Sequence, residues 1–415
     1  MKDAGKLGMI KVFRGMEITR NNQGCSPAVG IDLGITNSVA ALYRCGRLQM
    51  VVDKNGSCIV PSCVYYPENG NPCHVRGFIA KVRIEVHPKS VIHDFLPLIG
   101  VKYSDPVVKH VQDSVGFTIV DDGDNNPVIS VLTHGEEKRL YPEQVSSFIL
   151  EHLKELTQSC CGFDITDAVI SVPVWFSSLQ QQLIRDAAIM AKLNAIDVVS
   201  EPVLAAYTYT DVLDTSEKER TVLVYNMGGV AFDASLVRIK GIDYEVLAYV
   251  CDLQLGGNDF DRLIRDYLIK KYKEEAEEEY GELSKRDIDR LLRKCEEAKI
   301  DLRVLLEWDI EINDDIDWYL SRWRMNSLIS DKIDESIRLC DNAIARAGLA
   351  VNDIDAIVLA GGSSQLLIVE EKLRNHFPHL EIKHSIAPEE CVAVGAAKYA
   401  YALSTGKYFV TPSHP

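Results

Sequence analysis

The chain contains the same pattern twice, and this duplication restricts its fold more than any other feature of the sequence. Residues 30–52 (GIDLGITNSVAALYRCGRLQMVV) and 224–247 (VYNMGGVAFDASLVRIKGIDYEVL) each read as a strand, a glycine bend, an alternating strand, a glycine turn and a further strand. When the two segments are aligned, Asp32 matches Asn226 and Gly34 matches Gly228. Self-similarity of this kind indicates a repeated structural unit. We therefore expect a duplicated α/β protein with a cleft between its halves.

Helices and strands alternate after the first hairpin. Residues 142–156 place apolar side chains at helical spacing, and residues 168–176 read as a buried strand that Pro173 ends. A serine-capped helix follows, and then a second strand that ends at Glu201. Open α/β sheets bind their ligands at the carboxyl ends of strands, so Glu201 is a candidate site residue.

The second half continues with a helix that starts near Gly257 and with charged helices over residues 273–302. Residues 307–321 alternate as a hairpin, and the strand before Gly361 breaks into a helix at a pair of glycines. Residues 388–403 predict a closing helix.

Composition limits the function classes. A chain of 415 residues, 47% of them hydrophobic, is long enough for two domains. Its net charge of -16 argues against general binding to nucleic acid or to an anionic membrane. We find no spanning segment and no signal core, and therefore expect a cytoplasmic protein. The 11 cysteines contain no Cys-x-x-Cys pair, so buried reduced thiols are expected rather than zinc or disulfides.

Three glycine bends follow buried strands, at Gly34, at Gly228 and Gly229, and at Gly361 and Gly362. Backbone amides at such bends can hold phosphate oxygens. Each bend alone is typical of a plain tight turn, but three in a duplicated α/β chain favour a phosphate-binding cleft.

Four charged residues are candidates for chemistry beside these bends: Asp32, Lys81, Glu201 and Asp233. Carboxylates can hold Mg²⁺ through its waters and orient an attacking water, and a lysine can steady a phosphate. The alternative is that each acid caps a turn and that Lys81 is a surface lysine.

Several motifs together carry a family resemblance over about residues 28–404. In this order and spacing the chain resembles the nucleotide-binding domain of the Hsp70 chaperone family, through GIDLGITNSVA, AVISVPVWF, SEPVLAA, LGGNDFD, VLAGGSS and VAVGAAKYA. The resemblance implies an actin-like, ribonuclease H-like ATPase fold of two lobes, with ATP or ADP, Mg²⁺ and K⁺ bound between them.

The resemblance also implies roles for individual residues. Asp32 and the degenerate position Asn226 would hold the metal through water, Lys81, Glu201 and Asp233 would be catalytic, and Pro173 would be the hinge. The nucleotide would contact Gly34, Ile35, Thr36, Asn37, Gly228, Gly229, Val230, Glu296, Lys299, Gly361, Gly362, Ser363 and Glu389.

The sequence departs from the family pattern within this same site. Asn226, Val230 and Ala231 stand where the resemblance implies an aspartate, a glycine and a threonine, and Ile35 replaces a threonine. The adenine-stacking arginines are replaced by Ile300 and Gln365, and a ribose-side serine by Arg303. Each lost contact is worth about 1 kcal/mol or more, so nucleotide affinity is expected to fall by several decades.

The implied domain organisation has two lobes and no substrate-binding domain. Lobe I comprises residues 28–214, with an insertion at 61–141, and is completed by a closing helix at 385–404. Lobe II comprises residues 215–384, with an insertion at 255–333. An N-terminal extension at 1–27, expected to be disordered, precedes lobe I, and a tail follows at 405–415.

Two functions follow from the resemblance. The first is a chaperone-system protein in protein folding with weak ATP binding and slow hydrolysis. The second is a non-catalytic regulatory or scaffolding partner of other chaperones or of ribosomes. A J-domain protein or a nucleotide-exchange factor is an expected partner, and a monomer is the expected state. A sugar kinase on the same fold is the weakest alternative, because no phosphoacceptor-binding segment is evident.

Overall fold

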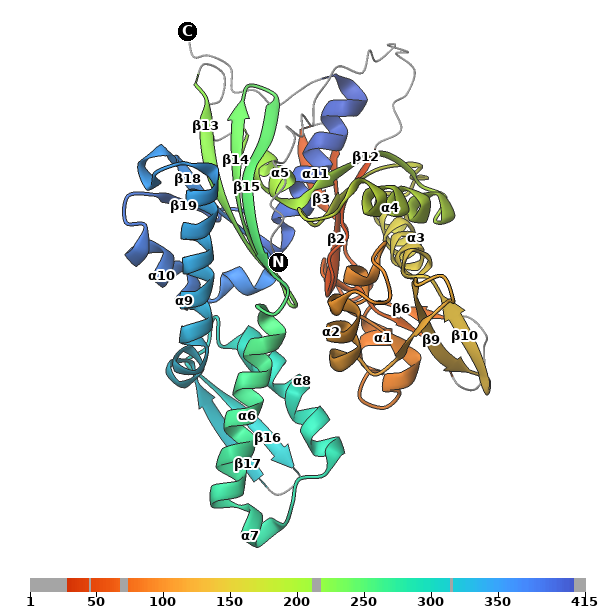
Figure 1. The fold of residues 1–415 in the computed structure, drawn as a ribbon, viewed down its shortest axis with the longest axis vertical. Helices are drawn as coiled ribbons and strands as arrows, with labels where there is room; N and C mark the ends of the chain where they lie inside the picture. The colour runs from red at the N-terminus through yellow and green to blue at the C-terminus, as the bar shows by residue number, and fades with distance from the viewer. Residues whose placement is uncertain (1–27, 45, 68–73, 211–217, 314–315, 407–415) are drawn as a thin grey trace.

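The computed structural model describes residues 28–44, 46–67, 74–210, 218–313 and 316–406. Two α/β lobes lie side by side, and each is built on its own sheet (Figure 1). The fold class is therefore the predicted one.

The lobe I sheet contains the first hairpin. Its strand order is β12-β11-β1-β2-β3, with β4 (Val60–Pro61) paired to β2. Strands β1 and β11 run parallel, as do β11 and β12, whereas β2 is antiparallel to both β1 and β3. The strands span Val29–Asp32 (β1), Asn37–Arg44 (β2), Arg47–Met50 (β3), Asp167–Val172 (β11) and Asn194–Ser200 (β12).

The lobe II sheet repeats this topology with the second hairpin. Its order is β15-β14-β13-β18-β19, with β13, β18 and β19 parallel and β14 antiparallel to both its neighbours. The strands span Arg220–Met227 (β13), Phe232–Lys240 (β14), Asp243–Asp252 (β15), Ala356–Ala360 (β18) and Glu381–Lys383 (β19). The shared strand order confirms the predicted duplication.

Helices cover the sheets, and those that begin after Tyr141, after Ser177 and after the glycine pair at Gly361 lie where the sequence predicts them, whereas the helix over 322–347 has no counterpart among the predictions. Tyr141 precedes the long helix of lobe I, and Ser177 accepts from the Gln180 amide at the start of the next one. The helices are α3 (Pro142–Cys161), α4 (Ser178–Met190), α5 (Glu201–Thr208), α9 (Arg322–Ala347) and α10 (Leu367–His376).

Helix α11 (Pro388–Thr405) returns from the far end of the chain to lobe I, where it contacts β1, β2 and α5. Its approach to α5 is close, because a Cβ added at Gly395 would lie 1.9 Å from the Leu204 carbonyl oxygen. Glycine at this position is what lets the two backbones meet.

Each lobe carries an inserted part. In lobe I it comprises β5 (Val64–Tyr65), β6 (Val75–Arg76), α1 (Phe78–Lys81), β7 (Val91–Ile92), α2 (Pro106–Ser114), β8 (Thr118–Asp121), β9 (Pro127–Thr133) and β10 (Glu136–Leu140). In lobe II it comprises α6 (Gly257–Glu275), α7 (Glu277–Tyr280), α8 (Lys285–Asp301), β16 (Glu307–Asn313) and β17 (Ile316–Ser321).

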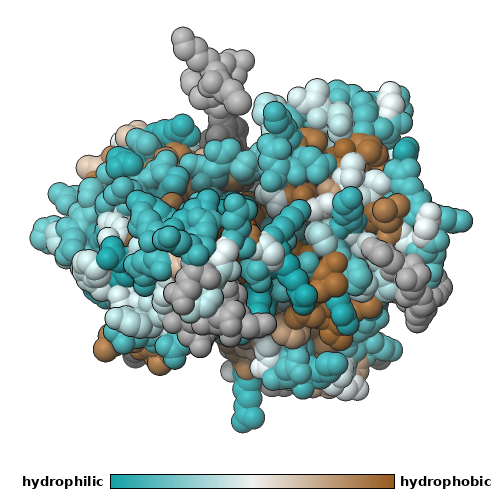
Figure 2. Space-filling view, turned by 90° about the horizontal axis from the view of Figure 1, so that it is seen from below, coloured by the Kyte–Doolittle hydropathy of each residue, from teal (hydrophilic) through white to brown (hydrophobic). Residues whose placement is uncertain are grey.

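The surface is mostly hydrophilic when seen from below, with hydrophobic residues gathered in one part of that face (Figure 2). Within the described residues, none of the helices has the length and hydrophobicity that spanning a membrane requires. The described cysteines are free thiols; Cys63, Cys295, Cys340 and Cys391 are buried. The prediction of buried thiols is wrong for Cys251, which is exposed near the end of the outermost strand β15.

Candidate functional site

Three acids and one amide meet where the two sheets face each other. Asp32 ends β1, Glu201 starts α5 directly after β12, and Asn226 and Asp233 are opposite each other in the β13–β14 hairpin. The Asn226 side-chain nitrogen donates to Glu201 Oε2 at 2.8 Å and to Asp233 Oδ2 at 2.9 Å. One amide group therefore joins an acid of lobe I to an acid of lobe II.

Burial makes these acids weak. It raises the pKa of Asp32 to about 6 and that of Asp233 to about 7, although Asp32 accepts a hydrogen bond from Ser171 at 2.6 Å. The pKa of Glu201 is raised well above its usual value, by burial first and then by the charges of Asp32 and Asp233. Within the part of the chain that the structure describes, none of the three acids has an ion pair. A cation bound here would stabilise the ionised form of the three acids.

The oxygen atoms of the three acids fit an Mg²⁺ ion that keeps its water shell better than an Mg²⁺ ion that they would bind directly. Among the described residues no group of three or more His, Cys, Asp or Glu side chains is arranged to hold a metal ion directly. Mg²⁺ usually keeps several waters and takes only one or two carboxylates from the protein, so contact through water satisfies this geometry. Asn226 fits less well, because its nitrogen already donates to two of the acids.

The glycine bends of the two lobes face each other. A Cβ on Gly229 would lie 2.6 Å from Thr36 Oγ1, so the bend that holds Gly34, Ile35, Thr36 and Asn37 contacts the second hairpin. The Thr36 hydroxyl donates to Asp94 at 3.0 Å. The lobe II side of this contact is formed by Gly229.

Some of the predicted phosphate-binding amides have partners inside the protein. The Gly228 amide donates to the Ala231 carbonyl, and the Gly361 amide to the Pro388 carbonyl, both at 2.9 Å. The Ser363 hydroxyl donates to the Gly228 carbonyl at 2.9 Å. A phosphate in this cleft would therefore use other amides of the bends, including those of Gly362 and Gly229.

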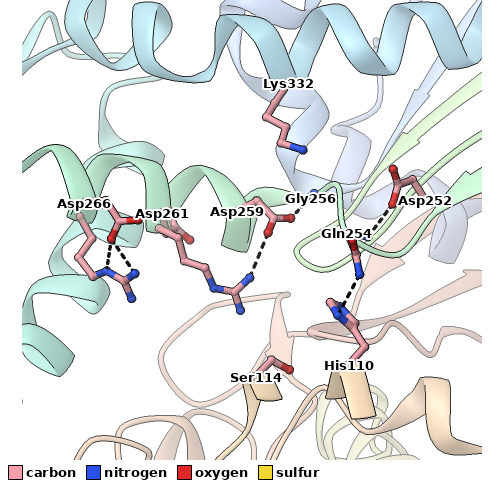
Figure 3. A network of polar contacts seen from close by, with 12 residues as sticks. His110, Ser114, Asp252, Gln254, Gly256, Asp259, Asp261, Asp266 and Lys332 are labelled. Carbon is pink, nitrogen blue, oxygen red and sulfur yellow. Dashed lines mark hydrogen bonds and ion pairs between the residues drawn. The ribbon is translucent and has the colours of Figure 1, made fainter. Parts of the chain in front are cut away.

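Val230 lines a small cavity where the lobes approach each other. The cavity holds about 20 Å³, which is room for one water and too little for a phosphate. Figure 3 shows Gln254, from the segment after β15, reaching towards His110 of α2, and the Gln254 amide nitrogen lies 3.2 Å from His110 Nδ1.

Lys81 pairs with an acid outside the group of three. Its amine forms an ion pair with Glu296 of α8 at 2.7 Å, so it joins lobe I to lobe II. Burial lowers the pKa of Lys81, but the charge of Glu296 and its hydrogen bond outweigh this, and the pKa is raised. A second bridge, from Arg293 to Glu85, lies alongside. Among the described residues, Lys81 has no ion pair or hydrogen bond with Asp32, Glu201 or Asp233, and its catalytic role stays a prediction.

The remaining predicted residues lie in both lobes, Lys299 in lobe II and Pro173 and Glu389 in elements of lobe I. Lys299 is buried and donates to Asp261 Oδ2 and to the Gly257 carbonyl, both at 2.8 Å. Arg303 donates to Gln365 at 2.8 Å and lies 3.5 Å from Glu389 Oε2. Pro173 directly follows β11, and its carbonyl accepts from the Phe176 amide at 3.0 Å. The hinge role of Pro173 stays a prediction.

Two site residues escaped the sequence reasoning. Asp261 holds Lys299, and burial raises its pKa to about 6. Asp94 holds Thr36. Asp261 lies in the quoted motif LGGNDFD, so its position was a usable signal, whereas Asp94 follows a two-residue strand that shows no periodicity.

Comparison with known proteins identifies the family. The family model for the Hsp70 protein matches residues 28–410. A heat shock 70 kDa protein of Neurospora crassa is 34% identical over 385 residues, which is 91% of this chain and 58% of that protein. Heat shock cognate 70 kDa protein 3 of Dictyostelium discoideum is 34% identical over 387 residues, 92% of this chain and 61% of that protein. Heat shock 70 kDa protein 2 of Paracoccidioides lutzii is 33% identical over 385 residues, with 91% and 58% coverage.

This chain spans about six-tenths of the length of the relatives it matches. Its two duplicated α/β lobes have the architecture of the actin-like ATPase fold. The chain belongs to the Hsp70 family.

Proposed function

We propose that this chain is a chaperone-system protein, acting in protein folding, that binds ATP or ADP with Mg²⁺ weakly and hydrolyses ATP slowly. The observation that supports it is the group of three buried acids, without an ion pair among the described residues, beside two facing glycine bends. A K⁺ ion remains part of the proposal on the family resemblance alone.

The proposal gives each residue of the acid group a task. Asp32 would hold Mg²⁺ through water, and Glu201 and Asp233 would orient the metal waters and the attacking water. The bound Mg²⁺ would neutralise charge on the phosphates. Asn226 weakens the site, because it presents a hydrogen-bond donor to two acids at a position where a carboxylate would add negative charge for the metal.

Calorimetric titration tests the proposal. ATP and ADP are titrated with and without Mg²⁺ into the wild type and into Asn226→Asp, and ATP turnover is measured on the wild type and on Glu201→Gln. We expect weak Mg²⁺-dependent binding that Asn226→Asp strengthens, and slow turnover that Glu201→Gln removes. Binding that is unaffected by Mg²⁺ in both proteins would contradict the assigned site.

A second function is favoured by the bridges between the lobes. Lys81 pairs with Glu296 and Arg293 pairs with Glu85, so two ion pairs connect the lobes at this place. This suits a non-catalytic partner of a J-domain protein, an exchange factor, another chaperone or the ribosome. Turnover that is the same in the wild type and in Glu201→Gln, together with retained folding, would favour this second function over the first.

We further propose the lobe boundaries given by the sequence, a monomeric state and a cytoplasmic location. Sedimentation velocity of the purified chain tests the monomer, and cell fractionation tests the location.

A further inference from the structure

A bridge of polar side chains lies next to the glycine bend at Gly362. Arg303, just after α8, donates to Gln365 Oε1 at 2.8 Å, and the Gln365 amide donates to Glu389 at the start of α11. Arg303 also lies 3.5 Å from Glu389 and donates to the Ile300 carbonyl at 2.9 Å. We refer to Arg303, Gln365 and Glu389 as the Arg303 bridge.

The Arg303 bridge lies beside one of the predicted phosphate-binding glycines. A Cβ on Gly362 would lie 3.6 Å from Glu389 Oε2, so the bridge and the bend are neighbours. A ligand with its phosphates against this bend would have its adjoining part close to the bridge. The family resemblance implies that Glu389 contacts the nucleotide, so a nucleoside is expected at this end of the site.

The other polar groups assigned to a nucleoside also have protein partners. Glu296 pairs with Lys81 at 2.7 Å, and Lys299 with Asp261 at 2.8 Å. Ile300 is 42% exposed and offers only an aliphatic surface. To read a base edge or a sugar, each of these side chains must first leave its charged or hydrogen-bonded partner.

Strong discrimination between ligands needs polar groups that find a partner only when the correct ligand binds. Hydrophobic surface alone separates similar ligands weakly. We propose, resting on the proposed function, that the cleft recognises the magnesium-bound triphosphate and does not discriminate between bases. Its ligand class comprises nucleoside triphosphates of any base and inorganic tripolyphosphate.

Calorimetry on the wild-type chain tests this, with Mg²⁺ and ATP, GTP, CTP or inorganic tripolyphosphate as separate ligands. We expect dissociation constants within about threefold of one another, a spread well below one factor of ten. ATP binding about tenfold or more tighter than all the others overturns the inference and leaves the proposed function standing. Absence of binding by all four ligands overturns the proposed function, and the inference with it.

Two variants test whether a bound base lies near Ile300. Ile300→Arg places a guanidinium at an exposed position of the nucleoside end, where it can stack on a base. We expect ATP and GTP to bind about fivefold tighter while tripolyphosphate changes little. Val304→Arg adds the same charge one turn further along, at a side chain that is 82% exposed, and serves as the control. Equal gains for nucleotides and tripolyphosphate in Ile300→Arg overturn the assignment of this end to the base.

Discussion

The side-chain nitrogen of Asn226 lies 2.9 Å from Oδ2 of Asp233, the residue directly opposite it in the β13–β14 hairpin. The same nitrogen donates to Glu201 of the other lobe. The position therefore satisfies two buried carboxylates at once, and a change of this single group alters the whole acid cluster.

Asn226→Asp is expected to lower stability in the absence of divalent cations. The substitution removes two buried hydrogen bonds and adds a fourth acid to a buried group, at a cost of about 1–3 kcal/mol. Thermal melting in chelator and in excess Mg²⁺ measures the effect, and we expect Mg²⁺ to recover most of the loss. Asn352→Asp, an equal charge change at an exposed position, is the control. Equal shifts of the melting temperature in the two variants would contradict the assignment of this loss of stability to the buried acid cluster.

The Lys81–Glu296 pair is expected to hold the lobes together. It is about three-quarters buried and worth about 1 kcal/mol, so Lys81→Glu should speed nucleotide dissociation by about fivefold. Stopped-flow release of a fluorescent nucleotide provides the rate.

The exchanged pair Lys81→Glu with Glu296→Lys separates two roles of Lys81. If Lys81 acts by pairing, the double variant recovers the wild-type release rate and turnover. If Lys81 acts on the phosphate, release recovers and turnover does not, which would support the catalytic role predicted from the sequence.

His74 and His152 are expected to oppose the gain in stability that mild acid brings through buried acids such as Asp32 and Asp233, whose raised pKa values make the folded chain take up more protons than the unfolded chain. Burial lowers the pKa of both histidines, and the positive charge of Arg76 adds to this. Below a pH of about 6.5 the unfolded chain protonates these two rings, which resist protonation in the folded chain, so their own contribution to stability falls as pH falls. Denaturant unfolding of the wild type and of His152→Gln at pH values between about 7 and 5 isolates the contribution of His152. His152→Gln should gain more stability than the wild type as pH falls, and an identical pH dependence of the two proteins would contradict the assignment.

Gly395→Ala is expected to destabilise the fold, although alanine is the better helix former. The added methyl would lie 1.9 Å from the Leu204 carbonyl oxygen, and overpacking of this kind costs about 1–3 kcal/mol. Chemical denaturation measures it, with Gly228→Ala as the control, because a Cβ there meets its nearest atom at 3.5 Å. A neutral or stabilising effect of Gly395→Ala would show that α5 and α11 can move apart.

Much of the fold was predictable because the hairpin pattern occurs twice in the sequence and can be recognised without the structure. Strand, glycine and strand recur at matching positions, and parallel strands preceding helices leave few arrangements for the sheets. Glu201 was predictable for the same reason, since a strand end followed by a helix locates it at the ligand edge of a sheet.

The partners of the site residues were not predictable. Lys81 and Glu296 lie far apart in the sequence, and their pairing depends on how the lobes approach each other. The Arg303 bridge likewise needs three elements, and no local periodicity connects Arg303 with Glu389. Which charged side chains pair with each other depends on how the elements pack in three dimensions, and the local sequence does not contain this information.

Helix α11 has a consequence for how the chain is made. Val39 and Ala41 of β2 share a buried cluster with Ala393 and Ala397, so part of the lobe I core is contributed by the last described helix. While a nascent chain leaves the ribosome, these strands expose that apolar face until nearly all of the described sequence has been synthesised. Contacts so distant in sequence slow folding and prolong the exposure of aggregation-prone surface. A member of a chaperone family is itself expected to need protection during its own synthesis.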